Sequence, residues 1–277
     1  ITLKSDVAFI YDYESIWALN SQPGYEGNDF QDAIRRYYQA FFRAGVNVDM
    51  VKPEADITQY KLVLASDLFI LPDAIAEIID EYVKQGGVLL ADCRTGVKDE
   101  NNLCHDRTLP GLLSPALGVE IEEYEALQDV EYEVVGKDML PGAFTATKYT
   151  DWITNMGAEV LADYDQWHMK PFAAVTRNSY GKGYGWYVGT VMKEDAFYDQ
   201  LIAKLLTDAG IKPVINPPNG VEVSIRQGGG KKLLFLINHT EQTQMVNIPK
   251  GKLELLSQKK ADRTIELGTY GVAVIRF

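Results

Sequence analysis

Short, nearly continuous apolar runs separated by helical patterns fill the first 92 residues, and this order constrains the fold most. The runs lie at 7–11, 60–64 and 87–91. Strands that are apolar without alternation are buried on both faces, as in a parallel sheet covered by helices. Helical spacing separates them at 29–44 and 73–85, and a glycine follows each segment. The order predicts a doubly wound α/β domain with a mostly parallel sheet.

A second pattern begins at the breaker-rich segment 215–220. Before it, the sequence predicts short acidic strands, a hairpin and a third helix, at 119–135, 172–190 and 195–209. After it, the segments alternate apolar and polar residues, which is typical of antiparallel strands with one buried face. We therefore expect two domains, an α/β domain over 1–214 and a small antiparallel β-sandwich over 215–277.

The composition limits the partners. The chain has 27 Lys and Arg against 39 Asp and Glu, a formal net charge of −12. Such a surface repels phosphate backbones and anionic headgroups, so neither nucleic acid nor a membrane is an expected partner. There is no signal-peptide pattern and no apolar run of the roughly 18 residues that a transmembrane helix needs. Cys93 and Cys104 suggest free thiols in a reducing, cytoplasmic compartment.

Several motifs, in this order, are shared with one enzyme family. They include Asp12-Tyr13-Glu14-Ser15 with Trp17, Arg35-Arg36-Tyr37-Tyr38, Val46-Asn47-Val48-Asp49, Gly96-Val97-Lys98-Asp99, Gly181-Lys182-Gly183 and Leu236-Ile237-Asn238-His239. Over nearly all 277 residues the chain resembles the trimerisation and C-terminal domains of glycoside hydrolase family 42 β-galactosidases. The first domain also resembles the class I glutamine amidotransferase fold.

The resemblance implies a parent enzyme that hydrolyses terminal non-reducing β-D-galactosides with retention, through two glutamates in an N-terminal (β/α)8 barrel. Such a barrel needs about 250 residues and eight strand–helix repeats. These residues hold fewer than half of those repeats, so neither glutamate can be assigned here. We expect the chain alone to be inactive, with no catalytic residue and no cofactor. Its first residue, Ile1, suggests a piece of a longer protein.

The resemblance also implies partners. They are two further copies of the chain in a homotrimer and the missing N-terminal barrel, and a galactoside would be met only through the parent enzyme. Loops of this domain lie near the neighbouring barrel's sugar pocket in such trimers. Candidates for an accessory wall of that pocket are Glu14, Trp17, Glu100 and His105.

The helix predicted at 29–44 carries more aromatic residues than one buried stripe requires. The residues concerned are Tyr37, Tyr38, Phe41 and Phe42. Aromatic residues are enriched at protein interfaces, so these four are candidates for subunit contacts. Burial beneath the following loop is the alternative.

Other functions stay open at this stage. Cys93 follows a buried strand, like the nucleophile of an amidotransferase, but its neighbours Asp92 and Arg94 are not small, and a thiolate needs a nearby histidine. Cys104 and His105 stand side by side without a second ligand pair, so no metal is expected. A stand-alone sugar-binding module is a further alternative.

Overall fold

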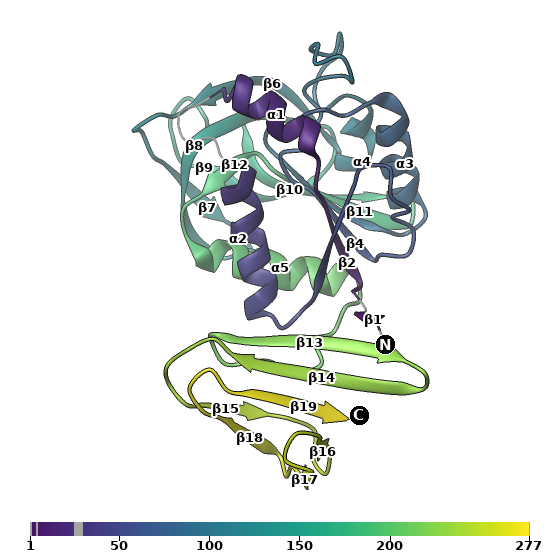
Figure 1. The fold of residues 1–277 in the computed structure, drawn as a ribbon. Helices are drawn as coiled ribbons and strands as arrows, with labels where there is room; N and C mark the ends of the chain where they lie inside the picture. The colour runs from purple at the N-terminus through teal and green to yellow at the C-terminus, as the bar shows by residue number, and fades with distance from the viewer. Residues whose placement is uncertain (1, 4, 25–29, 277) are drawn as a thin grey trace.

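The computed structural model describes residues 2–3, 5–24 and 30–276, which form a large α/β domain and a small β domain (Figure 1). The large domain is built on one mixed sheet in which β11-β5-β4-β2-β3 run parallel. These strands are β2 (Val7–Ile10), β3 (Val48–Val51), β4 (Leu62–Ala65), β5 (Val88–Asp92) and β11 (Gly183–Val188). Strands β2, β4 and β5 are buried along their whole length, as their unbroken apolar sequences predict.

Helices cover both faces of these parallel strands. On one face α2 (Phe30–Arg43) and α5 (Asp195–Asp208) share a core with alternate strand residues such as Phe9, Leu64 and Trp186. On the other face lie α3 (Asp73–Lys84), η1 (Gly111–Leu113) and α4 (Ser114–Leu117), with a second core that includes Ala8 and Val63. The doubly wound part of the prediction is therefore correct for this region.

The prediction of a mostly parallel sheet is wrong when the sheet of the large domain is taken as a whole. Strands β11 and β10 form the expected hairpin, and beyond it the sheet continues antiparallel. The added strands are β6 (Val119–Ala126), β7 (Tyr132–Gly136), β8 (Gly142–Asn155), β9 (Glu159–Tyr164), β10 (Ala173–Tyr180) and β12 (Thr190–Met192). Successive strands joined by short connections have no room for crossover helices, so neighbours pair antiparallel.

A short helix, α1 (Tyr13–Ser21), lies between β2 and α2, where the sequence predicted no helix. Asp12 caps it, because its side chain accepts hydrogen bonds from the backbone N–H groups of Glu14 (3.2 Å) and Ser15 (2.8 Å). The sequence also favours Asn28 or Asp29 as the N-terminal cap of α2, and both lie outside the described residues.

The small domain is antiparallel throughout. A six-stranded sheet, ordered β1-β13-β14-β19-β16-β17, is covered on one face by the two-stranded sheet β15-β18. The strands are β1 (Thr2–Leu3), β13 (Val221–Gly228), β14 (Lys231–Asn238), β15 (Gln244–Asn247), β16 (Leu253–Glu254), β17 (Lys259–Lys260), β18 (Thr264–Leu267) and β19 (Val272–Arg276). The domain is thus completed by residues from the start of the chain.

The two domains are also joined by one side chain. Asn47, just before β3, donates to the carbonyl oxygen of Val223 (3.0 Å) and accepts from the backbone N–H of Ile225 (3.1 Å). The amide therefore pairs with the edge of β13 as a neighbouring strand would. None of the helices in the described part of the chain is long and apolar enough to cross a membrane.

Candidate functional site

A buried carboxylate lies at the carboxyl ends of the parallel strands, the place where open α/β sheets usually bind ligands. Asp92 ends β5 and is 5% exposed. It accepts hydrogen bonds from Ser66 Oγ (2.5 Å), the backbone N–H of Asp67 (2.8 Å) and Tyr37 Oη (3.0 Å). The carboxylate thereby ties the ends of β4 and β5 to helix α2.

Two further carboxylates are buried close to Asp92, and the sequence did not predict any of the three. Asp151 on β8 accepts a hydrogen bond from Tyr187 Oη (2.7 Å). Asp67 has a positive φ of 50° and is 4% exposed, and its Oδ1 atom has no hydrogen-bond partner among residues 2–3, 5–24 and 30–276. Arg94 is the neighbouring cation, and its guanidinium lies 4.6 Å from the Phe69 ring centroid.

Burial controls the ionisation of this group. It raises the pKa of Asp151 to about 7, although the hydrogen bond from Tyr187 opposes the shift. Burial, followed by repulsion from Asp92, raises the pKa of Asp67 well above its usual range. Burial also raises the pKa of Asp92, against its hydrogen bonds from Ser66 and Asp67. Each of these buried carboxyl groups is therefore harder to ionise than an exposed one.

Cys93 lies beside these carboxylates and is 3% exposed. Burial, and then the negative charge of Asp92, raises the pKa of its thiol well above the ordinary value. The thiolate needed for nucleophilic catalysis is thereby disfavoured. The three histidines bond elsewhere: His105 to the Leu71 carbonyl, His168 to Glu125 and His239 to Glu222. The amidotransferase-like reaction is therefore unsupported.

The four candidate wall residues lie on two segments that meet. Glu14 and Trp17 are exposed on α1, and Trp17 retains 64% of its surface. Ser15 of the same helix accepts a hydrogen bond from the backbone N–H of Ile70 (2.9 Å).

The other two candidates lie in the loop after β5. Nε2 of His105 lies 3.1 Å from the carbonyl oxygen of Leu71, next to the residue that α1 contacts. Glu100 is exposed in the same loop. Both segments therefore form hydrogen bonds to residues 70–71, and the side chains of Glu14, Trp17 and Glu100 remain exposed to solvent.

The aromatic residues of α2 divide into two groups. Tyr37 and Phe41 are 3% and 0% exposed, so their prediction as interface residues is wrong. The reason is that α2 packs against both the sheet and α5, as shown by the edge-to-face contact of Tyr37 with Tyr198 at 5.3 Å. Phe42 is half-buried and contacts His239. Tyr38 remains 43% exposed.

No group of three or more His, Cys, Asp or Glu residues within the described ranges is arranged to hold a metal ion. Near the exposed Cys104, the Asp99 carboxylate instead accepts hydrogen bonds from the backbone N–H groups of Asn101 and Leu103, both at 2.9 Å. Both bonds go to Oδ1 of Asp99 and fix the loop.

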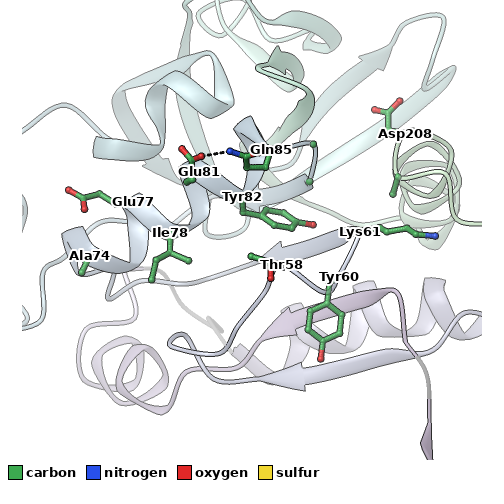
Figure 2. Close-up of a pocket in the computed structure, with 13 residues that line it drawn as sticks. Thr58, Tyr60, Lys61, Ala74, Glu77, Ile78, Glu81, Tyr82, Gln85 and Asp208 are labelled. Atoms are coloured by element: carbon green, nitrogen blue, oxygen red, sulfur yellow. Dashed lines mark hydrogen bonds between the residues drawn. The ribbon is translucent and has the colours of Figure 1, made fainter. Parts of the chain in front are cut away.

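A separate cleft of about 540 Å³ opens between α3 and the segment before β4 (Figure 2). This volume is in the range of small-molecule sites. However, Glu77 and Asp208 lie at opposite ends of the cleft, and Glu81 is bonded to Gln85. The hydroxyl of Tyr60 bonds to Asp49. The polar groups therefore do not converge on one ligand position, and the cleft is remote from the buried carboxylates at the other ends of the strands.

Comparison with known families agrees with this arrangement of domains. Residues 5–212 match the family model "Beta-galactosidase trimerisation domain", and residues 220–277 match "Beta-galactosidase C-terminal domain". The chain therefore belongs to the glycoside hydrolase family 42 β-galactosidases, in their trimerisation and C-terminal domains.

Curated relatives give the same result. The β-galactosidase Pbg of Clostridium perfringens is 30% identical over an alignment of 286 positions. The alignment covers 99% of this chain and 41% of the relative. The β-galactosidase BgaB of Geobacillus sp. is 31% identical, with 98% and 40% covered. The chain thus spans about two fifths of the length of these relatives.

Solved structures extend the comparison. The β-galactosidase from Bacillus circulans sp. alkalophilus superposes with a TM-score of 0.95 at 30% identity, over 99% of this chain and 41% of that one. An α-L-fucosidase from Paenibacillus thiaminolyticus has a TM-score of 0.69 at 12% identity. That second likeness concerns the fold alone.

Proposed function

We propose that the chain is the non-catalytic oligomerisation region of a β-galactosidase, and that it holds three copies of the complete enzyme together in the cytoplasm. The complete enzyme would hydrolyse terminal non-reducing β-D-galactosides with retention, through a catalytic barrel that these residues do not supply. The observation that carries the proposal is the pattern of coverage. The chain matches its β-galactosidase relatives over their trimerisation and C-terminal domains and over only 41% of their length.

The chemistry of the described residues supports this division of labour. A retaining glycosidase needs two carboxyl groups about 5 Å apart at a position that the sugar can reach. The clustered carboxyl groups here, Asp67, Asp92 and Asp151, are each at least 95% buried. Asp92 and Asp151 accept hydrogen bonds from neighbouring side chains, and a glycosidic oxygen cannot reach carboxyl groups buried in this way.

The exposed candidates take part in assembly in this proposal. Glu14, Trp17, Glu100 and His105 would form an accessory wall beside the sugar pocket of a neighbouring subunit. Tyr38 remains available for a subunit contact, and Phe42 lies against His239 at the junction of the two domains. The proposed likeness to class I glutamine amidotransferases concerns the arrangement of the strands and helices only.

The experiment measures assembly and activity of the purified chain side by side. We expect trimers that do not turn over a chromogenic β-galactoside. Hydrolysis that follows the protein through purification would contradict the non-catalytic part of the proposal. A chain that stays monomeric at every concentration would contradict the assembly part.

A further inference from the structure

The six-stranded sheet of the small domain has two different faces. Residues 221, 223, 234, 236, 273 and 275 point to the face that β15 and β18 cover, and all of them are buried in one cluster. Their neighbours in sequence point to the opposite face, because side chains alternate along a strand. We call this opposite face the outer face.

The register of the strands shows what the outer face carries. One row across the sheet pairs Arg226 with Leu233, Leu233 with Arg276, Arg276 with Leu253 and Leu253 with Lys260. The next rows are Ser224-Phe235-Val274 and Glu222-Ile237-Val272. Cations therefore line one end of the outer face, and apolar side chains fill its middle.

No second layer formed by the described residues covers these apolar side chains. Leu233, Phe235 and Ile237 are only partly buried, and Val272 is 48% exposed. Among the described residues, the hydrophobic clusters of the two domains do not include them. A contiguous apolar patch with a charged rim is typical of a protein-interaction surface.

The distribution of charge indicates what covers the outer face. Residues 215–277 hold nine of the 27 Lys and Arg and five of the 39 Asp and Glu, so this domain carries +4 while residues 1–214 carry −16. The acidic charge is densest at 119–138, where eight carboxylates stand against one lysine. Two domains of opposite sign in one chain provide the complementary surfaces that two copies need.

The stretch 119–138, which we call the acidic stretch, also matches the outer face in its apolar content. Glu122, Glu123 and Glu133 are exposed. Between them Tyr124 and Val130 remain 51% and 53% exposed. The stretch therefore combines carboxylates with uncovered apolar side chains, as the outer face combines cations with uncovered apolar side chains.

We infer that the outer face of the small domain binds the acidic stretch of a second copy of this chain. Strand β6, in the acidic stretch, lies at the end of the large domain away from the small domain, so one copy cannot join its own two surfaces (Figure 1). A contact between two different surfaces is heterologous, and repeated around an axis it closes a ring. The inference rests on the proposed function and specifies which surfaces join the subunits.

The test reverses charge on each surface of the full 277-residue chain. The outer-face variant is Lys260→Glu with Arg276→Glu, and the acidic-stretch variant is Glu123→Lys with Glu133→Lys. Both are expected to weaken assembly in sedimentation experiments by roughly tenfold or more, because like charges then face each other. The variant with all four changes restores opposite charges at every contact, so its assembly should return close to that of the unchanged chain.

A matched control separates this contact from a general effect of charge. Lys52→Glu with Lys212→Glu makes the same change in net charge as the outer-face variant, at exposed positions outside both surfaces, and it should leave assembly unchanged. Unchanged assembly in the outer-face or acidic-stretch variant, or no recovery in the fourfold variant, would overturn the inference while the proposed function stands. A monomeric unchanged chain would overturn both, and circular dichroism verifies that each variant is folded.

Discussion

The large and small domains of this chain achieve their folds by different means. The large domain buries two hydrophobic cores, one on each face of its sheet, and also holds a carboxylate group inside. The small domain has one small core. Its sheet includes β1, from the start of the chain, and Asn47 of the large domain forms hydrogen bonds to its strand β13. The large domain therefore supplies its own stability, whereas the small domain depends on residues outside it.

The two domains also use buried carboxylates in opposite ways. In the large domain, Asp151 is shielded from water with one hydrogen bond from Tyr187, and burial raises its pKa to about 7. In the small domain, burial would raise the pKa of Glu254 as well, but hydrogen bonds from Ser257, Leu256 and Val274 outweigh it and lower the pKa to about 2. Hydrogen bonds from several backbone N–H groups therefore keep this carboxylate ionised despite its burial.

The largest expected effect comes from removing one core side chain in each domain. Leu201→Ala in α5 and Leu234→Ala in β14 each truncate a fully buried leucine, and each should cost about 2–5 kcal/mol. All four tryptophans lie in the large domain, so their fluorescence reports that domain alone. In urea, Leu234→Ala should leave the tryptophan transition nearly in place while circular dichroism shows earlier loss of strand. Equal shifts of both signals would show that the domains unfold as one unit.

A smaller effect is expected at Glu254. Its carboxylate accepts hydrogen bonds from the backbone N–H groups of Ser257 (2.6 Å), Leu256 (2.9 Å) and Val274 (3.1 Å). Glu254→Ala leaves these donors unpaired and should destabilise the small domain by roughly 2–3 kcal/mol. Glu266→Ala, at an exposed position on β18, is the matched control and should be nearly neutral. Equal effects of the two changes would show that the hydrogen bonds contribute little.

The connection between the domains should have an effect of about 1–2 kcal/mol. Asn47→Ala removes both hydrogen bonds to the edge of β13. The small domain should then melt at a lower temperature and the tryptophan signal should shift less, so the gap between the two transitions widens. Asn247→Ala, exposed on β15, tests for a general effect of losing an asparagine. An unchanged gap in Asn47→Ala would show that the amide does not couple the domains.

The pH dependence of stability should have opposite sign in the two domains. Because the folded pKa of Asp151 lies above its usual 3.8, the large domain loses stability as the pH rises from about 4 to 7. Because the folded pKa of Glu254 lies below its usual 4.5, the small domain loses stability as the pH falls from about 4.5 to 2. Asp32, in the large domain, also has a lowered pKa, but the stability that it contributes is lost only as the pH falls below about 4.

Asp151→Asn tests the first half of this prediction. The amide cannot ionise and still accepts the hydrogen bond from Tyr187, so stability at low pH should change by about 1 kcal/mol or less. The measurement is the urea midpoint of tryptophan fluorescence at several pH values. A slope as steep in Asp151→Asn as in the unchanged chain would rule out this carboxyl group as a cause.

The sequence was most informative where one signal was sufficient. The nearly continuous apolar runs at 60–64 and 87–91 identify the parallel strands β4 and β5, because strands buried on both faces have few alternatives. The spacing in 30–43 likewise identifies α2. The antiparallel strands from β6 to β10 were not predicted as one continuous sheet, because an alternating pattern does not specify which neighbour a strand pairs with. The boundary near residue 215 stays a prediction, and β1 already departs from it.

The buried carboxylate group was missed for a related reason. Ser66, Asp67 and Asp92 follow apolar strands, where polar residues usually cap loops in solvent, and their shared environment becomes visible only when β4 and β5 are adjacent. A usable signal was that each strand has an acidic residue at its end or within two residues after it, Asp67 for β4 and Asp92 for β5. The burial of Tyr37 and Phe41 depends on α5, which is distant in the sequence, so the sequence around α2 gave no sign of it.

The central claim, that these residues are an assembly module, is tested most directly by the mass of the purified chain in solution. A concentration series in an analytical ultracentrifuge should converge on roughly 93 kDa, three times the 31.0 kDa of one copy. A particle of one chain mass over the whole series, at low and moderate salt, would contradict the account.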